Sequence, residues 1–113
     1  MDRQGYSKIM DQEKLIADAT KIIVEQANPN RIILFGSRAR GEAQSESDLD
    51  LLIIVPDGAS SIAARRAIGR ALISPDASYD LIVYTESEYE NKRREGWSIF
   101  DEIDRDGKVI YAA

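Results

Sequence analysis

The sequence of 113 residues contains neither cysteine nor histidine. The absence of cysteine excludes disulfide bonds and thiolate metal sites, and the absence of histidine removes the most common general base and the usual zinc ligand. A metal ion bound by this chain must therefore sit on oxygen ligands, which suit Mg²⁺, Mn²⁺ or Ca²⁺.

Long apolar runs and a positive net charge are also missing. No stretch approaches the roughly 20 apolar residues of a membrane span, and the start, MDRQGYSKIMDQEK, lacks the apolar segment of a signal peptide. We therefore expect a cytoplasmic protein with no membrane segment. The net charge of −5 speaks against broad, sequence-independent binding of nucleic acid.

The length and the apolar fraction of 43% predict one domain, residues 1–113, with one core. A homo-oligomer is compatible with this composition. Apolar periodicity and turn signals predict helices over residues 11–26, from 60 or 61 to 73, from 85 to 94 and a short one after Gly96, and strands over 31–35, 48–55, 79–84 and 108–111. This order indicates an α/β or α+β fold with a mixed sheet of about four strands packed with helices.

Three of these helices carry specific expectations. A serine should cap the helix that ends near residue 73, and a capping box should start the helix after Thr85. The side chains that we expect to face the core are Ile62, Ile68, Ala71 and Leu72 on the first of these helices, and Trp97, Phe100 and Ile103 on the short helix near the end of the chain.

The most informative stretch is GSRARGEAQSESDLDLLIIV, residues 36–55. Two aspartates, Asp48 and Asp50, lead into an apolar strand, although an ionised carboxylate taken out of water costs on the order of several kcal/mol. In an extended strand the side chains at i and i+2 point to the same face, so one metal ion can bind both. If the preceding strand is an antiparallel neighbour, Gly36 and Ser37 lie near Asp48.

Asp80 joins this group by topology. A strand–helix–strand crossover makes the strands 48–55 and 79–84 parallel, so their beginnings lie at one edge of the sheet. Three carboxylates, Asp48, Asp50 and Asp80, then converge there as metal ligands and catalytic residues. Such a site suits phosphoryl or nucleotidyl transfer with two metal ions, and Asp80 can help to remove a proton from an acceptor hydroxyl.

The glycine–serine turn fits the same chemistry. Gly36 lets the backbone approach a phosphate, and Ser37 offers an N–H and a hydroxyl at the start of a short helical turn. Arg38 or Arg40 can then pair with phosphate oxygens. Each element alone has an ordinary structural explanation, such as a turn, a helix cap or a solvent-exposed end of the sheet. The combination is specific for a site of this kind.

This signature of Gly-Ser, ten residues and Asp-x-Asp resembles that of the DNA polymerase β-like nucleotidyltransferase superfamily, in particular its minimal nucleotidyltransferase (MNT) branch. Within the ten residues, Ala39-Arg40-Gly41 and Ser47 also agree with the usual form. The resemblance spans residues 31–84 and, more loosely, the ending IDRDGKVIY. It implies that Asp48, Asp50 and Asp80 bind Mg²⁺, and that Gly36 and Ser37 contact a nucleoside triphosphate.

The resemblance also implies a partner. Minimal members are often paired with a helical HEPN protein, an RNase toxin, and in some pairs they act as antitoxins that transfer AMP from ATP to a tyrosine of the toxin. The leading hypothesis is therefore a Mg²⁺-dependent nucleotidyltransferase with ATP as substrate. The alternative is a non-catalytic antitoxin that neutralises a helical partner by contact. A receiver-like signalling domain is disfavoured, because its acids belong at the carboxyl ends of parallel strands.

Two basic clusters remain outside the candidate site. The first contains Arg65, Arg66 and Arg70, and the second contains Lys92, Arg93 and Arg94. Contacts with a triphosphate or a partner are one interpretation, and a solvated helix face is the more common one.

Overall fold

The computed structural model describes residues 3–41, 48–73 and 77–113, with side chains from Gln12 onward. Ser47 of the signature and the predicted helix break at residues 74–76 lie outside this part. The elements follow the order α1 (Arg3–Ala27), β1 (Arg31–Phe35), α2 (Ser37–Arg40), β2 (Leu49–Val55), α3 (Ser61–Ala71), β3 (Tyr79–Thr85), α4 (Glu86–Arg94), α5 (Ser98–Asp106) and β4 (Lys108–Ala112).

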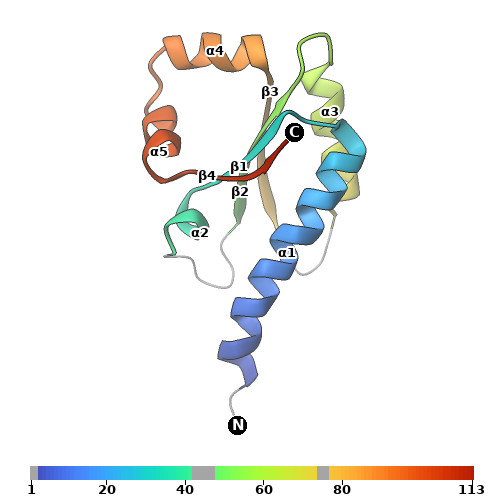
Figure 1. Ribbon diagram of the computed structural model, residues 1–113, viewed down its shortest axis with the longest axis vertical. Helices are drawn as coiled ribbons and strands as arrows, with labels where there is room; N and C mark the ends of the chain where they lie inside the picture. The colour runs from blue at the N-terminus through green and yellow to red at the C-terminus, as the bar shows by residue number, and fades with distance from the viewer. Residues whose placement is uncertain (1–2, 42–47, 74–76) are drawn as a thin grey trace.

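The strands form one sheet in the order β3-β2-β1-β4 (Figure 1). β1 is antiparallel to β2 and β4, and β2 is parallel to β3 across the α3 crossover. The predicted mixed sheet and both predicted strand pairings are confirmed.

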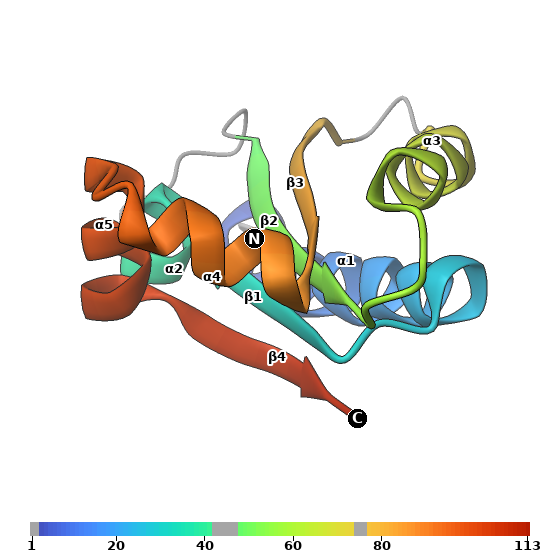
Figure 2. The same ribbon diagram turned by 90° about the horizontal axis from the view of Figure 1, so that it is seen from above.

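The apolar run of β2 is explained by two cores, one on each face of the sheet. Leu51 and Ile53 pack with α1 and α3, whereas Leu52 and Ile54 pack with α4 and α5. Figure 2 shows α3 and α4 on opposite sides of the sheet. Successive side chains of a strand point to opposite faces, so a central strand that is covered on both sides must be apolar at every position.

Both predicted helix caps are present. The Ser60 hydroxyl accepts a hydrogen bond of 3.1 Å from the backbone N–H of Ala63 at the start of α3. At the start of α4, the Thr85 hydroxyl accepts from the backbone N–H of Glu88, and the Glu88 carboxylate accepts from the backbone N–H of Thr85. Each cap satisfies backbone donors that have no partner within the helix.

The start of α1 was predicted wrongly. The helix begins at Arg3 and not near residue 11. Figure 1 shows its N-terminal part projecting beyond the sheet. The prediction followed the apolar stripe, which marks only the length of helix that packs on a core, and helical hydrogen bonding continues past that length.

Two side chains that we expected in the core are exposed. Trp97 is 57% exposed because α5 starts only at Ser98, so the indole precedes the helix and is not part of its apolar stripe. Ile62 is 66% exposed. The stripe of α3 that faces the core runs through Ala64 and Ile68, and Ile62 lies about 200° around the helix from Ala64.

None of the helices in residues 3–41, 48–73 and 77–113 combines the length and the apolar composition that crossing a membrane requires.

Candidate active site at the start of β2 and β3

The ladder of the sheet brings Asp50 and Asp80 together. Asp50 is paired with Asp80 in the parallel β2–β3 register and with Phe35 in the antiparallel β1–β2 register. Partners in a ladder point to the same face, so both carboxylates lie on the α4 and α5 side of the sheet, at the end where β2 and β3 begin. Asp50 is half-buried and Asp80 is exposed. The predicted convergence of these two residues is observed.

Gly36 lies directly against the Asp50 side chain. Its φ of 77° and ψ of −160° belong to a region that is essentially restricted to glycine. A Cβ built on Gly36 would overlap the Asp50 carboxylate. The glycine is therefore required both by its backbone conformation and by the space that the Asp50 side chain occupies. Directly after it, Ser37 begins α2, which confirms the predicted helical turn.

Asp48 lies just before β2 and is tied to the start of β3. Its carboxylate accepts a hydrogen bond from the Ser78 hydroxyl. The backbone N–H of Leu49 donates to the Ser78 carbonyl at 3.0 Å. These two bonds hold the ends of the neighbouring strands together and place Asp48 at the same rim as the other two aspartates.

The electrostatics of the rim centre on Asp50. Burial raises the pKa of its carboxyl, and the negative charges of Asp80, Asp48 and Glu102 raise it further, in that order. Arg40 opposes this shift. Because the carboxylates repel one another, the rim attracts cations.

The two arginines of α2 extend to different neighbours. The Arg40 guanidinium forms an ion pair of 2.6 Å with Glu102 of α5. The Arg38 guanidinium donates a hydrogen bond of 2.9 Å to the Gln12 side chain of α1. The fold therefore places Arg40 beside Asp50, while this contact of Arg38 is with α1 on the other side of the sheet.

The family model of the nucleotidyltransferase domain matches residues 16–111, which include the sheet and the whole rim. The chain belongs to the nucleotidyltransferase domain family. This match confirms the prediction of a nucleotidyltransferase enzyme from the Gly-Ser and Asp-x-Asp signature. No curated protein sequence matches the chain.

Solved structures share the fold of this nucleotidyltransferase domain. A protein from Sulfolobus solfataricus classed as a nucleotidyltransferase is 22% identical, with a TM-score of 0.59 over 94% of this chain and 87% of that one. A toxin–antitoxin structure with AMP-PNP is 22% identical, with a TM-score of 0.57 over 85% and 73%. A toxin–antitoxin MntA–HpeT variant with two aspartate-to-glutamate substitutions is 19% identical, with a TM-score of 0.59 over 87% and 73%. At these identities the likeness shows the fold.

The rim of this nucleotidyltransferase domain has the donor chemistry of a divalent metal site, since Asp48, Asp50 and Asp80 supply only oxygen ligands. The repulsion that raises the pKa of Asp50 is the interaction that a bound cation would relieve. Within the described residues, no three carboxylates are spaced so that they could already hold a metal ion. The residues fit the metal by donor type and by charge, and binding requires their side chains to turn toward a common point.

Sequence reasoning missed two residues of the rim, Ser78 and Glu102. Ser78 reaches Asp48 only because β2 and β3 are paired, and Glu102 reaches Arg40 only because α5 packs under β1 and β2. Neither residue belongs to a local pattern with Asp48 or Arg40. The one available signal was the acidic, outward position of Glu102 on a helix whose other face is apolar.

Proposed function

We propose that this nucleotidyltransferase transfers AMP from ATP to a hydroxyl acceptor, a tyrosine of a helical HEPN-type RNase toxin, and thereby acts as an antitoxin in the cytoplasm. The observation that carries the proposal is the pairing of Asp50 with Asp80 in the parallel ladder, with Gly36 against the Asp50 carboxylate. The two neighbouring carboxylates suit a cation and the adjacent glycine turn suits a phosphate, so both could bind at one place.

Each residue has a defined role in this reaction. Asp48, Asp50 and Asp80 would hold two Mg²⁺ ions, and Asp80 accepts the proton of the attacking hydroxyl. The bound ions would supply charge neutralisation for an in-line displacement. The new bond joins the acceptor oxygen to the α-phosphorus of ATP, the bond from this phosphorus to the bridging oxygen breaks, and pyrophosphate leaves.

The turn and the arginines bind the triphosphate. The main chain at Gly36 can approach a phosphate closely because glycine has no side chain, and Ser37 donates from its N–H and hydroxyl. Arg40 is well placed to exchange its ion pair with Glu102 for a phosphate oxygen, because it already lies beside Asp50. Arg38 has the same role from the other side of α2, after leaving its hydrogen bond to Gln12.

The toxin acceptor is supported by the structural neighbours. Two of them are toxin–antitoxin structures, and one of these contains AMP-PNP, an ATP analogue. The aligned region covers 73% of each of those chains, so the nucleotidyltransferase domain accounts for most of them. The net charge of −5 also favours a protein acceptor over a nucleic acid.

The decisive experiment incubates the purified chain with labelled ATP, Mg²⁺ and the purified protein encoded by the neighbouring gene. We expect label on a tyrosine of that protein and none with Asp50→Asn. Asp104→Asn on the outer surface of α5 serves as the matched control and should label normally. Neutralisation of the toxin by Asp50→Asn, with no label under any condition, would instead favour the non-catalytic binding alternative.

A further inference from the structure

The outer face of α3 carries three exposed arginines, Arg65, Arg66 and Arg70. No carboxylate in the described residues forms an ion pair with any of them. By contrast, Arg31, Arg40, Arg93, Arg94 and Arg105 each pair with a carboxylate. On a chain with a net charge of −5, α3 is therefore a local region of positive charge.

The same segment carries apolar side chains that the fold leaves outside its cores. Ile62 is 66% exposed and Ile73 is 82% exposed. Ile62 lies in the first turn of α3 and Ile73 follows the end of the helix at Ala71, so the two isoleucines lie at opposite ends of the segment that carries the arginines. Exposed isoleucines on either side of exposed arginines match a partner that offers acidic residues together with an apolar contact.

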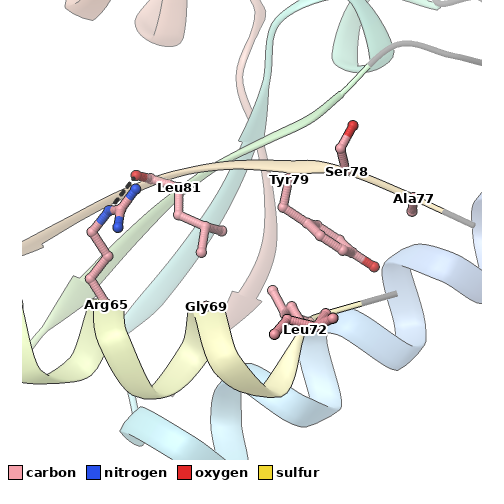
Figure 3. Close-up of a pocket in the computed structure, with 8 residues that line it drawn as sticks. Arg65, Gly69, Leu72, Ala77, Ser78, Tyr79 and Leu81 are labelled. Carbon is pink, nitrogen blue, oxygen red and sulfur yellow. Dashed lines mark hydrogen bonds between the residues drawn. The ribbon is translucent and has the colours of Figure 1, made fainter. Parts of the chain in front are cut away.

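A pocket of about 300 Å³ lies between α3 and β3 (Figure 3), and Ile73 is one of the residues that line it. Gly69 leaves it open, since a Cβ at that position would meet nothing within 4 Å. Leu72, Tyr79 and Leu81 provide its apolar surface. Arg65 of α3 also lines the pocket, and it donates from Nε to the Leu81 carbonyl of β3 at 3.3 Å.

The pocket adjoins the candidate active site at one residue. Ser78 lines the pocket, and its hydroxyl donates to the carboxylate of Asp48. A segment bound along α3 and the edge of β3 therefore ends beside Asp48, and it reaches Asp50 and Asp80 on the other face of the sheet by passing around the start of β3. This position beside the rim suits an acceptor of the transferred group.

We propose that the face of α3 with the adjoining pocket is the docking surface for the protein acceptor, which binds through an acidic segment with an apolar anchor. The inference rests on the proposed function, because it states where the acceptor of that reaction is held. A nucleic acid is the less suitable occupant: its phosphates would use the arginines but leave Ile62, Ile73 and the pocket uncovered.

The test compares two charge-reversal variants with equal change in net charge. Arg66→Glu/Arg70→Glu alters the α3 surface, and Arg94→Glu/Arg105→Glu alters exposed arginines on α4 and α5. Binding of the purified protein from the neighbouring gene is measured by calorimetry at about 0.15 M and about 1 M NaCl, where the Debye length falls to about 3 Å. Binding of ATP and labelling of the partner are measured alongside.

The α3 variant should bind the partner about tenfold or more weakly at the lower salt concentration and lose most of the salt dependence. Its ATP affinity should be unchanged, and saturating partner should restore the labelling rate. The α4/α5 variant should behave as the wild type in every assay. Ile73→Ser should weaken the same binding by a smaller factor, with Val109→Ser on β4, another exposed apolar residue, as its control.

Three outcomes overturn the inference. If both charge-reversal variants bind the partner and label it equally well, the partner docks elsewhere and the proposed function stands. If poly(U) RNA binds the wild type and the α3 variant alone loses it, the surface serves a nucleic acid. If the wild type neither binds nor labels the partner, the proposed function fails, and the inference fails with it.

Discussion

Arg40 of α2 and Glu102 of α5 form an ion pair of 2.6 Å beside the half-buried carboxylate of Asp50. The pair connects the helix that follows the glycine–serine turn to the helix that closes one face of the sheet. It places one positive and one negative side chain at the rim where ATP is proposed to bind, so the two charges act on nucleotide affinity in opposite directions.

Replacing Glu102 should therefore strengthen binding of ATP. Glu102→Gln removes a negative charge near the triphosphate and releases Arg40 from this ion pair. The expected gain is a few-fold in affinity, because pairs of this exposure contribute about 0.2–1 kcal/mol. Calorimetry with a non-hydrolysable ATP analogue measures it. Asp104→Asn, which breaks the Arg93 pair on the outside of α5, is the matched control and should leave the affinity unchanged.

Removing the charge of Asp50 should stabilise the metal-free protein at neutral pH. Its pKa is raised in the folded state, chiefly by burial, so folding favours the protonated form. The resulting stability is fully present below the ordinary pKa of 3.8 and is lost as the pH rises through the folded-state pKa. Asp50→Asn should thus melt a few degrees above the wild type at pH 7 in EDTA, and the gap should close as the pH approaches 3.8.

A control of opposite sign exists for this experiment. Arg93 lowers the pKa of Asp104, so the stability from that pair is present above the ordinary pKa and is lost as the pH falls through the folded-state pKa. Asp104→Asn should melt below the wild type at pH 7. If Asp50→Asn also melts lower in EDTA, the carboxylate of Asp50 stabilises the fold and the electrostatic interpretation of the rim is wrong.

The glycine at the turn should be irreplaceable. Gly36→Ala combines a strained backbone, worth about 1–3 kcal/mol, with overlap between the new Cβ and the Asp50 carboxylate. Gly58→Ala has a positive φ of 96° but open space around its Cβ, so it reports strain alone. Denaturant unfolding should show both variants destabilised. Only Gly36→Ala should also lose Mg²⁺-dependent ATP binding, and equal loss in both variants would contradict the account.

The capping box of α4 should affect stability without affecting activity. Thr85→Ala removes the hydroxyl that accepts from the Glu88 N–H and should cost about 1 kcal/mol of unfolding free energy. Ser60→Ala at the cap of α3 should cost a similar amount. Urea unfolding gives the stability, and the labelling assay at a temperature where both variants are folded should give wild-type rates. A lost activity would place α4 in the site.

Much of the fold follows from local patterns. The strand 31–35 was predicted with its observed bounds, and the two helix caps were found because serine, threonine and glutamate at those spacings bond to backbone donors within three residues. The approach of Asp80 to Asp50 also followed, because a strand–helix–strand crossover makes the two strands parallel and so brings their beginnings to one edge of the sheet.

The errors and omissions share a physical origin. Trp97 and Ile62 were expected in the core because they match the spacing of apolar residues in an amphipathic helix. This spacing alone does not show where a helix starts or which part of it is buried. Ser78 and Glu102 reach the rim through strand pairing and helix packing. No local pattern encodes such contacts between distant segments, so the sequence predicted that the three aspartates meet at one rim but not the residues that contact them there.

The central claim is that Asp50 and Asp80 act together on a divalent cation and ATP, and its most direct test is calorimetric titration of ATP with Mg²⁺ or with EDTA. For the wild type we expect binding that weakens about tenfold or more in EDTA, since two carboxylates then face the triphosphate without a bridging cation. Asp50→Asn and Asp80→Asn should both lose the Mg²⁺ dependence, while Asp104→Asn should retain it. Equal ATP affinity in Mg²⁺ and in EDTA, or unchanged Mg²⁺ dependence in both rim variants, would contradict the account.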